Sequence, residues 1–164
     1  MSAIKTSAIR HMLTAILLSA LFIALPAKTE TTGNSGELSA TLTITMKGFR
    51  NTKGRVFIAL FDKQNGFPND RDKSCRKAKE DIDADSVVVV FENVPYGSYA
   101  ISVYHDENNN GKLDKRWGVI PSEGIGSSNN VRQQKKAPSF DDARFSVTDS
   151  TVALEIKITY IFDD

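Results

Sequence analysis

Oxygen-bearing side chains stand at alternate positions of the segment 106–114, which reads DENNNGKLD. This order matches the start of a calcium-binding loop, in which ligands at positions 1, 3 and 5 precede a glycine at position 6. Gly111 permits the sharp turn that lets several oxygens surround one hard cation. The pattern therefore predicts a Ca²⁺ site. The expected metal ligands are Asp106, Asn108, Asn110, the main-chain carbonyl of Lys112, Asp114 and Glu123.

The loop departs from a helix-loop-helix calcium site because Trp117 stands where that motif has a bidentate glutamate. We expect Glu123 to fold back as the missing ligand, with Asp62 and Asp142 as the other candidates. With so few carboxylates, the expected Kd is weak, on the order of 10⁻⁴ to 10⁻³ M. The competing interpretation is a long turn without metal, since Asn, Asp and Gly favour turns. Trp117 is expected to cover the core, and His105 to be a hydrogen-bonded core or rim residue.

Composition limits the class of protein. The 164 residues suit one domain, and 40% hydrophobic with 25% charged residues is typical of a globular chain. The formal net charge of +1 gives no electrostatic case for binding nucleic acid. Cys75 is the one cysteine, which excludes an internal disulfide and leaves an interchain bond or a bystander thiol.

The first 27 residues have the features of a secretory signal peptide. Lys5 and Arg10 precede an apolar run at 12–25 that is short for a membrane span, and cleavage is expected after Ala27. A retained signal anchor is the alternative. Residues 28–36 are small and polar, as in a flexible leader. The protein is therefore expected to be secreted or periplasmic, with a signal helix, no membrane span after cleavage, and a domain at 37–164.

Alternation of apolar and polar residues predicts about seven strands and no helix in that domain. The second of these strands is apolar on both faces and should be central, and the third is charged and should lie at an edge. The expected strands are 38–47, 55–61, 76–85, 86–91, 99–104, 143–147 and 152–162. A long irregular loop is expected over 106–139. The predicted fold is all-β, a single antiparallel β-sandwich of immunoglobulin-like size.

Two sets of residues carry resemblances to known proteins. The phrase FENVPYGSYAISVYHD resembles the strand-turn-strand corner of transthyretin-like and carboxypeptidase-regulatory-like β-sandwiches. The words ALFDKQNGFPND, HDENNNGKLD, PSEGIGSSNN and APSFDDARF closely resemble a family of bacterial exported proteins known as domain of unknown function 2141, over roughly 42–160. In that family an aromatic residue commonly precedes the Ser-Asn pair, where this chain has Ser127. The resemblance implies a fold and export, and it implies no activity.

Three classes of function remain open from the sequence. The leading hypothesis is an exported, non-enzymatic β-sandwich that binds a cell-envelope or extracellular partner or a glycan through a calcium-stabilised surface. The alternative is a small periplasmic hydrolase that uses Asp106, Asp114 and Glu123 as acid and base. No GxSxG, HExxH or P-loop motif supports that enzyme. The third class is a structural module that self-associates through the edge strand at 76–85. The oligomeric state stays open.

Overall fold

The computed structural model describes residues 38–131 and 136–162, so the expected signal peptide, its cleavage after Ala27 and the leader 28–36 lie outside the described residues. The strands are β1 (Ser39–Lys47), β2 (Arg55–Phe61), β3 (Arg76–Asp81), β4 (Ser86–Pro95), β5 (Gly97–Asp106), β6 (Lys115–Arg116), β7 (Ile120–Pro121), β8 (Gly124–Ser127), β9 (Phe145–Val147) and β10 (Thr151–Lys157). The helical segments are the 3-10 turns η1 (Arg71–Lys73) and η2 (Ser128–Asn130) and the α-helix α1 (Phe140–Ala143). The all-β prediction is confirmed. Over these same residues, no helix has the length and apolarity that a membrane crossing requires.

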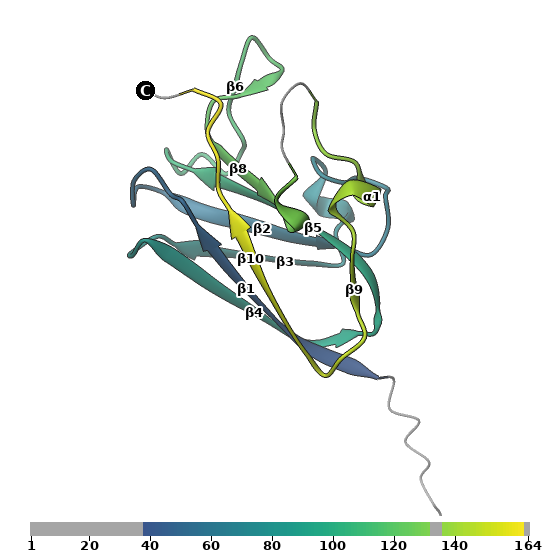
Figure 1. Cartoon of the computed structure of the whole chain (residues 1–164). Coiled ribbons are helices and arrows are strands. Elements are labelled where there is room, and N and C mark those ends of the chain that lie inside the picture. The colour runs from purple at the N-terminus through teal and green to yellow at the C-terminus, as the bar shows by residue number, and fades with distance from the viewer. Residues whose placement is uncertain (1–37, 132–135, 163–164) are drawn as a thin grey trace, which may run out of the picture. The chain divides into compact units, whose positions relative to one another are not determined.

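The strands form two principal sheets (Figure 1). One sheet has the order β10-β1-β4, and the other has the order β3-β2-β5-β8, with β9 also pairing with β5. The central position of β2 and the edge position of β3 are as predicted. The prediction of an antiparallel fold throughout is wrong, because β1 and β10 run parallel. A parallel pair needs a long crossover, and here nearly the whole domain separates the two strands.

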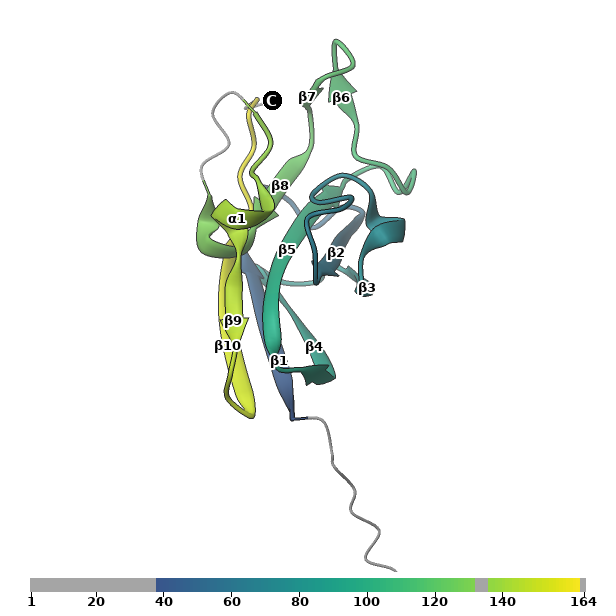
Figure 2. The same cartoon turned by 90° about the vertical axis from the view of Figure 1, so that its right-hand side faces the viewer.

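The sheets share one hydrophobic core, which follows from the alternation in the sequence. In β1 every second residue from Ala40 to Met46 is buried, and β4 repeats the pattern with Val87, Val89 and Phe91. Figure 2 shows β1, β4 and β10 beside β2, β3 and β5. The core includes Leu42, Ile44 and Met46 of β1, Ile58 and Leu60 of β2, Val89 of β4, Ile101 and Val103 of β5, and Ile156 of β10.

A second, smaller core covers the other face of β2 and β5. Ala59 and Phe61 of β2 and Ala100 of β5 pack against Phe140 and Ala143 of α1. The prediction that the domain has no helix is therefore wrong at 140–143. This helix is only four residues long, too short for a helical hydrophobic repeat, and it is fixed by a capping box between Ser139 and Asp142.

The prediction of an irregular loop over 106–139 is also wrong, because this segment contains β6, β7, β8 and η2. All four residues of β8 are buried, and the strand pairs antiparallel with β5. A Cβ atom at Gly124 would lie 2.6 Å from the Tyr160 ring, so glycine is needed for this close packing. The last strand ends at Lys157 rather than 162, because Thr159 leaves β1 and bridges to Ile125 instead.

One buried hydroxyl closes a gap along β5. The strand pairs with β9 through Gly97–Tyr99 and with β8 from Ser102 onward, which leaves the N–H of Ile101 between the two ladders. The Ser128 hydroxyl accepts from that N–H at 2.9 Å and donates to the carbonyl of Ala143 in α1. Ser128 therefore joins β5, η2 and α1 through one side chain.

We expect Ser128→Ala to lower the free energy of unfolding by about 2–3 kcal/mol, because it leaves a buried N–H and a buried carbonyl without partners. Urea denaturation of the two proteins measures the difference. Ser146→Ala on the exposed face of β9 is the matched control, with an expected change within about 0.5 kcal/mol. Equal effects of the two substitutions would contradict the bridging role of Ser128.

Candidate functional site

The segment 106–114 follows β5 directly and folds around the carboxylate of Asp106. Asp106 is 1% exposed. Its Oδ1 accepts from the backbone N–H of Asn110 at 3.1 Å, and its Oδ2 accepts from the N–H of Gly111 at 2.7 Å. Gly111 has φ +77°, a left-handed conformation that glycine adopts without strain. The first expected ligand thus lies at the base of the turn, as its position in the motif predicts.

Three other expected ligands meet at the outer side of the same turn. The side-chain amides of Asn108 and Asn110 donate to the Asp114 carboxylate at 2.7 and 3.0 Å. Their own carbonyl oxygens each accept a backbone N–H, from Asn110 and Lys112 respectively. These Asx-type turns order the loop through side chain to backbone hydrogen bonds.

Glu123 returns to this loop, as the sequence analysis expects. It is 5% exposed and stands immediately before β8. Its Oε1 accepts from the N–H of Glu107 and its Oε2 from the N–H of Asp114, both at 2.9 Å. The carboxylate therefore joins the two ends of the loop.

The electrostatic environment of Glu123 favours its protonated form. Burial raises the pKa of this carboxyl above its ordinary value, the two backbone hydrogen bonds lower it, and the charges of Asp114 and Asp106 raise it again. Three carboxyl groups, those of Asp106, Asp114 and Glu123, therefore lie close enough to influence one another at this end of the sheet.

The structure brings together the five expected ligand side chains, and the hydrogen bonds already described use part of their capacity. Each oxygen of the Asp106 and Glu123 carboxylates has two lone pairs and accepts one backbone N–H, which leaves capacity for a hard cation. Within residues 38–131 and 136–162, no group of three or more His, Cys, Asp or Glu side chains has the arrangement of a metal centre. A cation here would depend on amide and main-chain oxygens as well.

Asp62 and Asp142, the other candidate ligands, have different surroundings. The Asp142 carboxylate accepts from the backbone N–H and the hydroxyl of Ser139 at the start of α1. Asp62 follows the end of β2, where its charge acts on Cys75. Burial and the Asp62 charge raise the pKa of the Cys75 thiol, so this group is a poor nucleophile at neutral pH.

Sequence reasoning missed Glu107, which anchors the start of the loop. Arg50 binds its carboxylate through Nε at 2.9 Å and Nη2 at 2.8 Å, and the Asn51 amide donates to it at 2.9 Å. Arg50 also lies over the Tyr160 ring, 4.5 Å from its centre. The partners are more than fifty residues away in sequence, so no local pattern could have revealed this network.

His105 is fully buried and hydrogen-bonded on both ring nitrogens, as expected. Its Nε2 donates to the carbonyl of Lys53 at 2.6 Å, and its Nδ1 shares a hydrogen bond of 2.7 Å with the Tyr160 hydroxyl. Both nitrogens are engaged, so the ring positions the end of β5 and is not available to a ligand.

Trp117 does not cover the core, contrary to the sequence expectation. It is 79% exposed at the turn between β6 and β7, where the backbone has φ +53°. One edge of its ring meets Phe162, with the ring centres 6.0 Å apart. An apolar Trp side chain is usually buried, but the short β6–β7 hairpin with its three-residue turn leaves this one no core to join.

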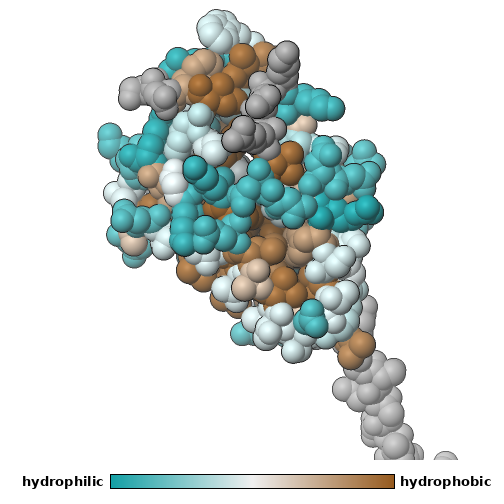
Figure 3. Space-filling view, in the orientation of Figure 1, coloured by the Kyte–Doolittle hydropathy of each residue, from teal (hydrophilic) through white to brown (hydrophobic). Residues whose placement is uncertain are grey.

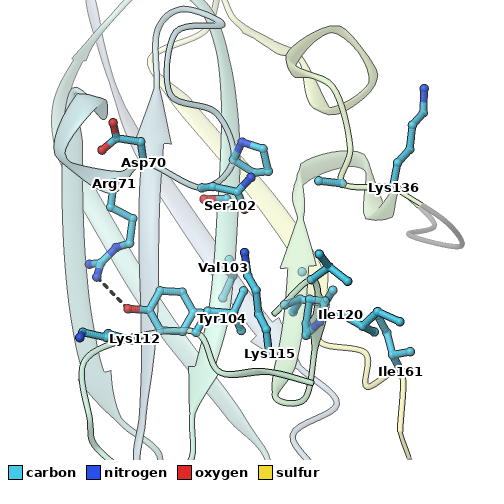
Figure 4. A pocket seen from close by; sticks show the side chains of 18 of the residues that line it. Asp70, Arg71, Ser102, Val103, Tyr104, Lys112, Lys115, Ile120, Lys136 and Ile161 are labelled. Atoms are coloured by element: carbon cyan, nitrogen blue, oxygen red, sulfur yellow. Dashed lines mark hydrogen bonds between the residues drawn. The ribbon is translucent and has the colours of Figure 1, made fainter. Parts of the chain in front are cut away.

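A cleft of about 660 Å³ lies beside the loop, and Figure 4 shows its lining side chains. Gly111, Lys112 and Leu113 of the loop form part of its wall. Tyr104 of β5 lies at its base, where its hydroxyl donates to the carbonyl of Gly111 at 3.1 Å. The candidate metal loop and the cleft are thus neighbours that share residues.

The comparisons with known proteins gave one match. A family model described as an uncharacterised protein conserved in bacteria (DUF2141) matches residues 44–155. This range lies within the span on which the sequence analysis based its resemblance. Neither the search of curated proteins nor the search of solved structures found a match.

We expect Gly54→Ala to destabilise the protein much more than Gly118→Ala. Both glycines have positive φ, +71° and +75°, so both substitutions incur the left-handed penalty of about 1–2 kcal/mol. Only at Gly54 would the new Cβ collide, at 1.9 Å from the carbonyl oxygen of Asp106. The expected loss for Gly54→Ala is about 3 kcal/mol or more, measured by urea denaturation. Similar losses for the two substitutions would contradict this prediction, because they would show that the Asp106 backbone moves aside at little cost in folding free energy.

We expect Glu123 to make stability fall as the pH rises above the ordinary glutamate value of about 4.3. The raised pKa means that the folded state binds the proton more tightly, so deprotonation costs folding free energy. In a chelating buffer, the stability of wild type relative to Glu123→Gln should therefore decrease from pH 5 to pH 7. Urea denaturation at several pH values tests this. Glu92→Gln, at an exposed position of β4, should leave the pH profile unchanged.

Proposed function

The chain belongs to the bacterial DUF2141 family, and we propose that it is an exported, non-catalytic binding module. Its loop end binds a cell-envelope or extracellular partner or a glycan, and Ca²⁺ orders that end. We further propose that the two sheets form a β-sandwich of the immunoglobulin-like or transthyretin-like kind. The hydrophobic core that the two sheets share supports the β-sandwich. The basic and apolar features of residues 1–27 support secretion or a periplasmic location.

The observation that carries the proposal is the pair of buried carboxylates, Asp106 and Glu123, beneath one surface loop. Burying charge is costly unless it is compensated, and here four backbone N–H groups provide the compensation. Asp114 adds a third charge at the same place. A calcium ion would relieve the mutual repulsion of these carboxylates and hold the loop in one conformation.

The same contacts favour binding over hydrolysis. An acid or base must reach its substrate, yet Asp106 and Glu123 are 1% and 5% exposed, and all four of their oxygens accept backbone N–H groups. Self-association through β3 is opposed by charge, since five of its six residues are charged and nearly all are exposed. We therefore infer that the loop end of the protein, rather than its sheet edge, makes the functional contact.

We expect millimolar CaCl₂ to raise the Tm of the mature domain relative to EDTA, with MgCl₂ giving a smaller shift. At tenfold excess over Kd, a ligand bound only by the native state adds about 1.4 kcal/mol, or roughly 5 °C for a domain of this size. Differential scanning fluorimetry measures the shift. Asp114→Asn should abolish it, whereas Asp83→Asn in the exposed turn after β3 should preserve it.

Equal shifts with calcium and magnesium, or a shift that Asp114→Asn leaves intact, would contradict the assignment of calcium to this loop. In that case the hydrogen bonds of Asn108 and Asn110, together with those of Asp106 and Glu123, explain the ordered turn without a metal.

A further inference from the structure

The cleft beside the loop has walls from distant parts of the chain. Its lining comes from η1 and the residues before it, from β5, from the loop and hairpin at 111–121, and from β8. The volume of about 660 Å³ lies in the range of small-ligand sites, which is roughly 300–1,000 Å³. A ligand of a few sugar rings fits this size.

Positive charge dominates the ionisable groups of the cleft. Four cations line it: Arg71, Lys112, Lys115 and Lys136. Its two acids are each already paired, Asp70 with Lys73 at 3.0 Å and Asp72 with Lys77 at 2.9 Å. In the part of the chain that the structure describes, the three lining lysines form no ion pair. The cleft thus attracts an anion.

Arg71 is held in position by a ring and a hydroxyl, and one of its guanidinium N–H groups lacks an acceptor among the described residues. Its guanidinium lies over the Phe57 ring, 4.5 Å from the centre, and its Nη1 donates to the Tyr104 hydroxyl at 3.1 Å. Its Nε is buried and has no acceptor among the described residues. Figure 4 shows Arg71 on one side of Tyr104 and Lys115 on the other. Both cations line the cleft.

Exposed apolar side chains border the cleft at the hairpin. Trp117 and Val119 are 79% and 71% exposed, and Ile161 is 45% exposed. Figure 3 shows hydrophobic atoms gathered at the end of the molecule where β6 lies in Figure 1, with hydrophilic atoms beside them. Large apolar side chains left in water beside a cleft mark a binding surface. The contact of Trp117 with Phe162 orients the indole and leaves its surface accessible.

We propose that the cleft and the tip of the β6–β7 hairpin bind an acidic glycan. Arg71 and Lys115 bind the carboxylate or phosphate of the sugar, and the indole of Trp117 packs on the apolar C–H face of a sugar ring. This inference rests on the proposed binding function and names its ligand class. A lipid surface fits less well, because a flat bilayer does not enter a concave cleft of about 660 Å³.

The test uses the fluorescence of Trp117, which is the one tryptophan of the chain and so reports on the hairpin alone. We titrate the mature protein with oligogalacturonate of four to six sugars, and in parallel with a neutral galactose oligomer of the same length. Each titration is run in calcium and in EDTA. A saturable change in intensity with the acidic oligomer, weakened by added salt, is the expected result.

Three variants locate the site. Lys115→Gln should weaken the binding of oligogalacturonate about fivefold, and Trp117→Ala, measured by calorimetry, about tenfold. Lys157→Gln, an exposed lysine of β10 outside the cleft, should leave the affinity unchanged. Lys115 and Trp117 are exposed, so neither substitution should affect folding. Equal affinity of all three variants would overturn the assignment of the cleft.

Other outcomes separate this inference from the proposed function. Equal binding of the neutral oligomer overturns the acidic class while the binding module stands. A change in Trp117 fluorescence with vesicles of phosphatidylcholine and phosphatidylglycerol, but with no glycan, overturns the glycan proposal. The surface then binds a membrane instead. If no probe binds and calcium still raises the Tm, the ligand inference fails and the calcium loop remains.

Discussion

Strand β5 determines where the candidate site lies, because two segments share its second edge. β9 takes the first part of that edge and β8 takes the last part, with His105 opposite Gly124. The residue before β8, Glu123, therefore comes opposite Asp106, which ends β5. This register directs the Glu123 carboxylate to the base of the loop, where it accepts from both loop ends. A slip of one residue would turn that side chain to the other face of the sheet.

The register also concentrates charge. Burial raises the pKa of Glu123, and the register places this carboxyl close enough to Asp114 and Asp106 for their charges to raise it further. The neighbouring Glu107 does not add to this repulsion, because Arg50 binds it with two nitrogens. The interior of the loop is therefore acidic and its start is neutralised. The hydrogen bonds that order the loop thus also hold its carboxyl groups close together.

The sequence predicted the longer strands and missed the short strands β6, β7 and β8. β1 and β4 have an apolar residue at every second position, and both were predicted. β8 is buried on both faces and contains two glycines, because the Tyr160 and Ile158 side chains occupy the space of a Cβ at Gly124. Low β propensity thus hides a strand whose glycines are required by packing. The tight turn at 106–114 was predictable because its residue spacing is local, whereas the partners of Glu107 and the parallel pairing of β1 depend on contacts across the chain.

The acidic loop and the basic cleft share a wall, and this joins the two proposed binding events. The interior of the turn holds its carboxylates, while Lys112 and Lys115, on and just after the loop, line the cleft. A cation that orders the turn also fixes the backbone that carries these lysines, so a ligand anion finds them in place. Linkage requires the effect to be reciprocal: the factor by which calcium strengthens glycan binding is the factor by which the glycan strengthens calcium binding. If both proposals hold, a calcium site weakened by its few carboxylates would gain affinity when the cleft is filled, and the ligand itself would complete the order of the loop.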